Sequence, residues 1–188
     1  MRRFVNPGNT AFEVAVNSQI YVDKTGLLAY TNSVINTKQA LICSSRPRRF
    51  GKSITADMLC AYYSRGCDSD SIFASYEIAK SDSYRKHLNQ YDVIYLDIQW
   101  CMMDAGSAEQ TVSYLNYHVI EELKEIYPQI LLDGIRTAYG AMSCINAQTG
   151  VKFIVIIDEW DVLIRDEAAN EAVLQDYINF LRGMFKGS

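Results

Sequence analysis

The run "FIVII", from Phe153 to Ile157, is the feature that most limits how this chain can fold. A strand with one face in water alternates apolar and polar residues, whereas an unbroken apolar run is typical of a strand covered on both faces. We therefore predict a buried strand at residues 153–157, in a parallel sheet with helices on both sides. Asp158 and Glu159 follow it directly, at the end where open α/β sheets bind ligands.

Other segments alternate between strand and helix patterns. Residues 91–98 ("YDVIYLDI") are rich in aromatic and β-branched residues, and residues 39–45 ("QALICSS") are a short apolar run, so both are predicted to be strands. Apolar residues recur at helical spacing in residues 54–64, 107–127 and 167–185, which are predicted to be helices. This alternation predicts an α/β fold with three αβα layers and a mostly parallel sheet.

The composition is that of a globular domain. A chain of 188 residues with 49% hydrophobic residues can bury a sizeable core, so we expect residues 1–188 to form one domain. Residues 1–38 would provide a lead-in segment and a helix before the first core strand. The net charge of −4 argues against a general affinity for polyanions. Five cysteines without a C-x-x-C pair, and two histidines, indicate neither a disulfide framework nor a structural zinc site.

No segment is typical of secretion or of membrane insertion. The N-terminal sequence breaks at Asn6-Pro7-Gly8 before any apolar core region, which a signal peptide needs. No apolar run approaches the roughly 18 residues of a membrane-spanning helix. We therefore expect a cytoplasmic protein without a membrane partner.

A glycine, a lysine and a serine follow the predicted strand at residues 39–45. Gly51-Lys52-Ser53 matches the end of the phosphate-binding motif G-x-x-x-x-G-K-[ST], although Arg46 stands where the motif has its first glycine. In such a loop, backbone N–H groups and the positive end of the next helix bind an anion. Gly51 would let the backbone approach the phosphate, Lys52 would reach the β- and γ-phosphates, and Ser53 would ligate Mg²⁺.

The residues before Gly51 add positive charge and stiffness. Pro47 holds its own φ at about −65° and so stiffens the turn. Three arginines and Lys52 within seven residues favour a multiply charged anion. For the loop alone, two alternatives stay open: a chance Gly-Lys-Ser at a helix start, or a solvated arginine cluster. The residues expected to bind the nucleotide are Arg46, Pro47, Arg48, Arg49, Phe50, Gly51, Lys52, Ser53 and Ile54.

The two carboxylates after residues 153–157 are similar to a Walker B element. Phosphoryl transfer needs a carboxylate that holds the metal and a group that orients the attacking nucleophile. Asp158 would be the first and Glu159 the second, although an isolated Asp-Glu pair is more often an ordinary polar turn. Because both half-motifs follow predicted buried strands, together they predict a magnesium-dependent site with Lys52 and Glu159 as catalytic residues and with Ser53 and Asp158 as metal ligands.

Asp97 lies at the same end of the predicted sheet. It is the next-to-last residue of the predicted strand at residues 91–98, and Gln99 follows that strand, so both would lie on the ligand side. Two roles are open to these residues, the orientation of a water molecule and the capping of a turn or helix.

Three segments carry a resemblance to a known family. "YVDKTGLL" (21–28), "SSRPRRFGKSITADML" (44–59) and "FIVIIDEWDVLIRD" (153–166) resemble the AAA-ATPase-like proteins, bacterial P-loop ATPases that commonly carry a C-terminal nuclease-like domain of the PD-(D/E)xK type. Arginine in place of the first glycine of the loop is a trait of that family. The resemblance implies a P-loop NTPase-like fold, the cofactors ATP and Mg²⁺, and an ATPase activity that drives or regulates an attached or partner module. For residues 23–25 it leaves open a contact with adenine or a helix cap.

The resemblance also implies parts that this chain lacks. P-loop proteins with a glutamate after the Walker B aspartate usually place a further strand between the loop strand and the Walker B strand, and by analogy it comes later in the sequence. No strand is predicted after Asp166, so we expect a sheet that is incomplete at its C-terminus and a chain that hydrolyses ATP slowly or not at all. The nuclease-like domain would also lie outside this chain.

Two further functions remain open besides ATP hydrolysis. The chain would act as a non-hydrolysing nucleotide-binding switch if ATP only orders the domain. It would act as a nucleic-acid-binding module if the basic loop holds a phosphate backbone. Both an indirect contact with nucleic acid and an oligomer are compatible with the sequence.

Overall fold

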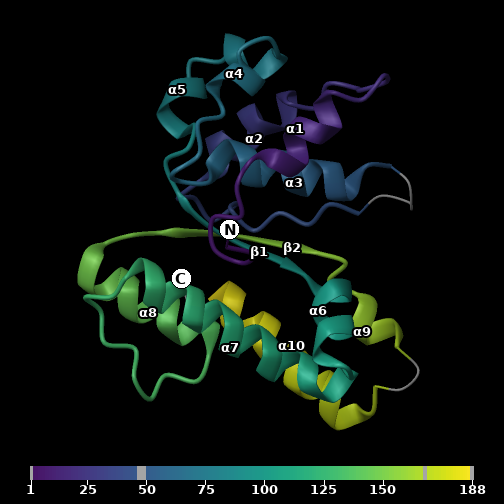
Figure 1. Cartoon of the computed structure of the whole chain (residues 1–188), viewed down its shortest axis with the longest axis vertical. Coiled ribbons are helices and arrows are strands. Elements are labelled where there is room, and N and C mark those ends of the chain that lie inside the picture. The colour runs from purple at the N-terminus through teal and green to yellow at the C-terminus, as the bar shows by residue number, and fades with distance from the viewer. Residues whose placement is uncertain (1, 46–49, 167–168, 187–188) are drawn as a thin grey trace. The chain divides into compact units, whose positions relative to one another are not determined.

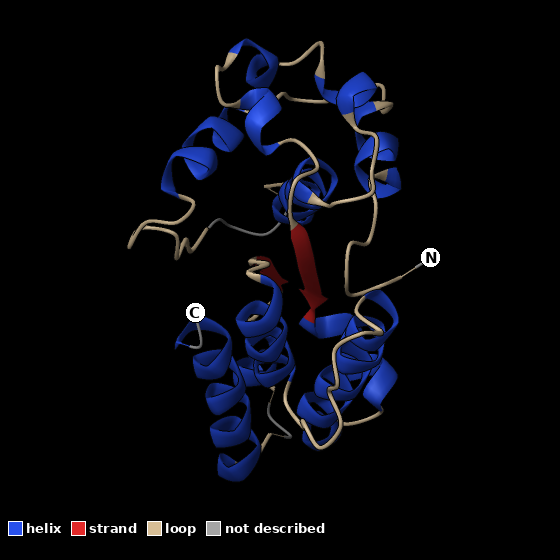
Figure 2. Ribbon diagram, turned by 90° about the vertical axis from the view of Figure 1, so that its left-hand side faces the viewer, coloured by secondary structure: helices blue, strands red, loops and turns tan. Residues whose placement is uncertain are grey.

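The computed structural model describes residues 2–45, 50–166 and 169–186 (Figure 1). Helices account for 55% of the structure, and two strands form a small parallel sheet, so the α/β class is confirmed (Figure 2). The chain divides into two compact units, one of residues 6–93 and one of residues 2–5 with residues 94–188. Among the described residues, no helix is both long enough and apolar enough to cross a membrane.

The first unit is helical and packs around aromatic side chains. Phe73 lies at the centre of this core, because Phe12 stacks on it with ring centroids 5.1 Å apart and Tyr62 meets it edge-on at 5.3 Å. Such offset and edge-on pairs are the preferred geometries of buried aromatic rings. The elements of this unit are α1 (Thr10–Val16), α2 (Gly26–Val34), α3 (Lys52–Tyr63), α4 (Asp70–Phe73), the 3₁₀ helix η1 (Glu77–Lys80) and α5 (Tyr84–His87).

The helix predicted at residues 54–64 is confirmed as α3. Met58 and Tyr62, one turn apart, are fully buried, as the apolar spacing predicts. Ile54 was expected on the same face but is 41% exposed. The first turn of α3 therefore projects beyond the core, which leaves the start of the helix accessible.

The strand predicted at residues 39–45 is wrong. These residues are described, and they form an exposed irregular segment in which Leu41 is 66% exposed. A short apolar run becomes a strand only when a neighbouring strand pairs with its backbone groups, since an isolated strand has no internal hydrogen bonds. Among the described residues, no strand pairs with this segment.

The second unit contains the sheet. Its strands are β1 (Asp92–Asp97), which begins in the first unit, and β2 (Phe153–Asp158), and both confirm predicted strands. The predicted helix at 107–127 is α7 (Ala108–Ile126). The one predicted at 167–185 is observed as α10 (Glu171–Lys186), and its predicted start at residues 167–168 lies outside the described residues. The remaining helices are α6 (Ile98–Ala105), α8 (Ala138–Thr149) and α9 (Val162–Arg165).

The helices of the second unit bury one face of this sheet. Figure 1 shows α7, α8 and α10 side by side along it, and their apolar residues share one core with Ile94 and Leu96 of β1. Residues 153–155 of β2 are only half-buried. The expectation that β2 is covered on both faces is therefore only partly met.

The N-terminal residues protect one edge of β1. Val5 forms an antiparallel bridge with Ile94, and the Tyr95 N–H donates to the Phe4 carbonyl at 2.8 Å. Glu122 of α7 accepts the N–H groups of Phe4 and Val5 at 2.9 and 2.7 Å. β1 therefore lies between the N-terminal segment and β2, and its parallel pairing with β2 brings the carboxyl ends of the two strands together.

Candidate functional site

The loop predicted to bind phosphate ends at a left-handed glycine. Gly51 is the N-cap of α3 with φ 72° and ψ 37°, a conformation that glycine adopts without the clash that a Cβ would cause. Its carbonyl accepts the N–H of Thr55 at 3.0 Å and the Thr55 hydroxyl at 2.9 Å, which starts the helix. Lys52 and Ser53 are therefore the first two helical residues, with Ser53 exposed.

The N-terminus of α3 is open among the described residues. No side chain of the described residues caps it, and the first N–H groups of a helix have no partner within the helix itself. These N–H groups and the helix dipole favour an anion at this position. Lys52 brings an ammonium group to the same turn, so the local geometry is that of an anion site.

A second lysine contacts this loop. The ammonium nitrogen of Lys24 donates a hydrogen bond to the Phe50 carbonyl at 2.7 Å. A Cβ added to Gly51 would also lie 2.7 Å from the same nitrogen, so Lys24 fills the space beside the glycine. The sequence signal for Lys24 was its place in the "VDKT" segment, but nothing in that segment indicates which group it contacts.

The residues on both sides of Lys24 hold the segment in place. Asp23 accepts the N–H of Thr25 at 2.7 Å and the N–H of Glu77 at 3.0 Å. The fully buried Thr25 hydroxyl accepts the N–H of Ile78 at 3.2 Å. The predicted helix cap is therefore found at a different helix, because these side chains bind the start of η1, whereas α2 has no side-chain cap among the described residues.

Asp158 closes β2 with a buried carboxylate. The residue is 7% exposed, and its Oδ1 accepts the N–H of Glu159 at 3.0 Å. Its Oδ2 is buried and has no hydrogen-bond partner among the described residues. A buried carboxylate oxygen without a partner is unfavourable, so this oxygen is a candidate ligand for a cation.

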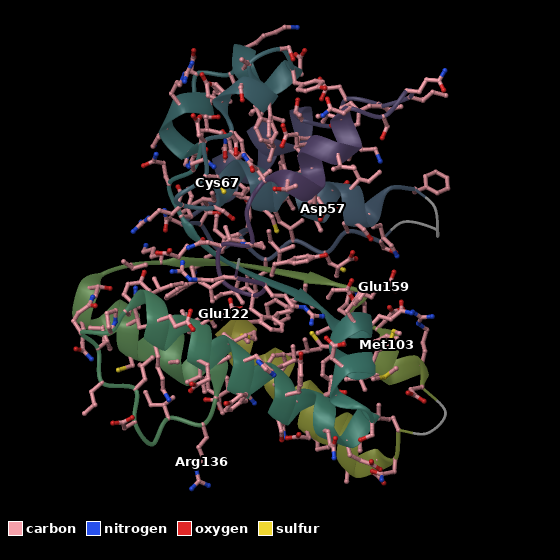
Figure 3. The ribbon with its side chains drawn as sticks, in the orientation of Figure 1. Asp57, Cys67, Met103, Glu122, Arg136 and Glu159 are labelled. Carbon is pink, nitrogen blue, oxygen red and sulfur yellow. The ribbon has the colours of Figure 1, made fainter. Side chains whose placement is uncertain are left out.

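Glu159 has a strained backbone at the same strand end. Its φ of 49° is uncommon for a residue other than glycine, asparagine or aspartate. Its Oε2 lies 3.5 Å from a terminal guanidinium nitrogen of Arg165, whose Nε pairs with Asp161 at 2.9 Å. Figure 3 shows Glu159 at the end of β2 beside α6. Strain of this kind is often found at functional sites, because surrounding contacts hold one side chain in a required direction.

Asp97 lies near these two carboxylates at the end of β1. Its Oδ1 accepts the N–H of Trp100 at 3.0 Å, which confirms the capping role at the start of α6. Burial raises the pKa of Asp97 above its ordinary value, and the charges of Asp158 and Glu159 raise it further, while the Trp100 N–H opposes the rise. Three carboxyl groups therefore lie near this end of the sheet, and it is the end at which the sequence predicts each of them.

The predicted site residues fall into two groups. Residues 50–54 come together with Lys24 in the first unit, and Asp158 and Glu159 come together with Asp97 in the second. Arg46, Pro47, Arg48 and Arg49 lie outside the described residues. That Lys52 and Asp158 meet on one nucleotide stays a prediction.

The groups present fit Mg²⁺ bound with a nucleotide. Mg²⁺ prefers oxygen ligands and is usually held by one or two protein oxygens together with substrate phosphates and water. In the second unit, the Oδ2 of Asp158, which has no partner among the described residues, is an oxygen of this kind, and in the first unit the exposed Ser53 hydroxyl is another. Among the described residues there is no cluster of three histidine, cysteine, aspartate or glutamate side chains that would bind a metal without a nucleotide.

Comparison with known proteins identifies one family. The sequence model of the family described as "Predicted AAA-ATPase" matches residues 8–188, a span that contains both the loop at Gly51 and the carboxylates at the end of β2. Neither the search of curated proteins nor the search of solved structures returned a significant match.

Proposed function

The chain belongs to the AAA-ATPase-like family, and on this premise we propose that it binds ATP at the start of α3 and hydrolyses it with Mg²⁺. ATP binding would drive or regulate an attached or partner module, because a conformational change of the loop would be transmitted to it. A nuclease-like module is one candidate for that partner.

The observation that carries this proposal is the start of α3. Gly51 turns the chain in a left-handed conformation directly before a helix that begins with Lys52 and that no described side chain caps. A triphosphate would accept hydrogen bonds from the first N–H groups of α3, and Lys52 would neutralise its β- and γ-oxygens. A neutral ligand would gain little from such a site, so the geometry favours a phosphate-bearing one.

The carboxylates of the second unit support the hydrolytic part. Asp158 would hold Mg²⁺ through its unpartnered oxygen, and the bound metal would supply charge neutralisation on the phosphate oxygens. Glu159 would orient the attacking water and accept its proton. In this structure the Glu159 carboxylate forms an ion pair with Arg165. Glu159 would have to leave that ion pair in order to contact the attacking water.

The first prediction tests nucleotide binding. We expect Lys52→Ala to raise the dissociation constant for MgATP by about 10- to 100-fold, because it removes a charged hydrogen-bond donor from the phosphate site. Titration calorimetry would measure this constant. The matched control is Lys38→Ala, since Lys38 is exposed and lies outside the loop. Equal affinities of the wild-type and Lys52→Ala proteins would refute the phosphate site at α3.

The second prediction separates hydrolysis from binding alone. Glu159→Gln should lower the turnover number by about 10²- to 10⁴-fold while it leaves MgATP affinity within a few-fold, because the amide cannot accept the proton of the attacking water. Phosphate release under saturating MgATP measures the turnover. Binding without measurable turnover of the wild-type protein would instead support the non-hydrolysing switch.

A further inference from the structure

We propose that Lys24 is a positioning residue of the nucleotide site, which holds the Phe50–Gly51 peptide in the orientation that binds phosphate. This inference rests on the proposed function of the loop. Lys24 is 26 positions before Phe50 in the sequence, yet its ammonium donates to the Phe50 carbonyl at 2.7 Å and fills the space beside Gly51.

The segment that carries Lys24 is anchored to η1 on both sides of the lysine. Asp23 and Thr25 each accept a backbone N–H from η1, and the Thr25 side chain is fully buried. The outer residues of the Asp-Lys-Thr triplet thus attach the segment to the fold, and the middle residue is left to project outward. Fixing an exposed lysine in one conformation costs conformational entropy of both its backbone and its side chain. Because the backbone of this segment is already anchored, only the side-chain part of that cost remains for the contact with Phe50.

The contact with Phe50 controls an N–H group of the loop. The peptide bond between Phe50 and Gly51 is planar and, like every peptide bond described in the chain, is not cis, so the Phe50 carbonyl and the Gly51 N–H point in opposite directions. Lys24 attracts the carbonyl to its own side, and the N–H is therefore directed away from Lys24. Because Lys24 holds it in this way, the Phe50 carbonyl oxygen does not turn toward the bound anion, where it would repel phosphate.

Lys24 also adds positive charge at the start of α3. One of its three N–H groups is used by the Phe50 carbonyl, and the ammonium lies beside the glycine that the phosphate must approach. An anion at this position would be attracted by two lysines, Lys24 and Lys52. The effect should be larger for ATP and ADP, which carry a β-phosphate, than for AMP.

The experiment compares three variants of the whole chain. We expect Lys24→Met to raise the dissociation constants of MgATP and MgADP about tenfold, with little change for AMP, since the hydrogen bond and the charge are both lost. Lys24→Arg keeps a charged donor and should stay within about threefold of the wild-type affinity. Lys38→Met is the control for loss of an exposed lysine. Because Lys24 is exposed, the melting temperature without nucleotide should be unchanged in all three.

A second measurement needs no nucleotide. Backbone relaxation of the Gly51 amide in the ligand-free protein reports its motion on the picosecond to nanosecond timescale. Lys24→Met should lower the order parameter of this amide and leave that of a mid-helix residue such as Met58 unchanged. This readout would not move if Lys24 only contributed general stability.

The outcomes distinguish this inference from the proposed function. If the wild-type protein fails to bind ATP, both are overturned. If the wild-type protein binds and Lys24→Met binds equally well, only the role of Lys24 is overturned. A loss of affinity that is the same for AMP as for ATP, or that comes with a lower melting temperature in both Lys24 variants, would show a structural role and would also overturn it.

Discussion

At the scale of single residues, neighbouring side chains in this chain have separate tasks. Asp23 and Thr25 anchor a segment, while Lys24 between them reaches Phe50. These contacts join groups that are 26 to 54 positions apart. The sequence shows such a triplet as a polar segment before a helix, but it does not show which groups the three side chains contact.

The third prediction concerns Asp23 and pH. Although partial burial opposes ionisation, the N–H groups of Glu77 and Thr25 lower the pKa of Asp23 below its ordinary value of 3.8. A lowered pKa in the folded state adds stability above pH 3.8, and this stability is lost as the pH falls through the folded-state value. The contribution is less than about 1 kcal/mol because Asp23 is exposed.

Urea unfolding at several pH values would measure this contribution. Wild-type protein should be more stable than Asp23→Asn at pH 6, and the difference should shrink below pH 4 as Asp23 becomes protonated. Asp133→Asn, a change at another exposed aspartate, serves as the control. A difference that is independent of pH would contradict the role of the ionised carboxylate.

At the scale of elements, the ends of β1 and β2 carry the acidic half of the proposed site. An apolar run was sufficient to predict β2 and the exit of Asp158 and Glu159 at its end, because a strand and its last residues depend on local pattern. The pairing of β1 with β2, which places Asp97 near Asp158, depends on contacts across the fold. The sequence therefore placed Asp97 at the correct end of the sheet without showing its neighbours.

The fourth prediction tests this half through its metal. With ATP present, saturating Mg²⁺ should raise the melting temperature of the wild-type protein by about 5 °C or more, because ligand binding to the folded state stabilises it. Asp158→Asn should lose most of this gain, since an amide is a weaker ligand for Mg²⁺ than a carboxylate. Removal of Mg²⁺ with a chelator should return the wild-type protein to its original melting temperature. An equal gain in Asp158→Asn and in the control Asp133→Asn would exclude Asp158 as a ligand.

At the scale of the whole molecule, the residues of the proposed site form two groups, or half-sites, that belong to different compact units. Gly51, Lys52 and Lys24 lie in the first unit, and Asp97, Asp158 and Glu159 lie in the second. The proposed reaction requires that both groups act on one triphosphate. The family assignment covers both units, since the match spans residues 8–188.

The fifth prediction is a double-mutant cycle across the units. If one MgATP contacts both half-sites, the effects of Lys52→Ala and Asp158→Asn on the free energy of MgATP binding should differ from additivity by about 0.5–3 kcal/mol. The four affinities of the cycle are measured by calorimetry. A cycle of Lys52→Ala with Asp133→Asn should be additive within about 0.5 kcal/mol. Additivity in both cycles would mean that the half-sites bind different ligands.

The sequence by itself determined the elements whose pattern is local. The strands β1 and β2 and the helices α3, α7 and α10 all follow from spacing and residue type within a short stretch. Only the tertiary structure decided that residues 39–45 lie exposed, that Lys24 contacts Phe50, and that Asp97 lies near Asp158. The physical reason is that strand pairing, side-chain hydrogen bonds and burial of charge depend on groups that the folded chain brings together from distant positions.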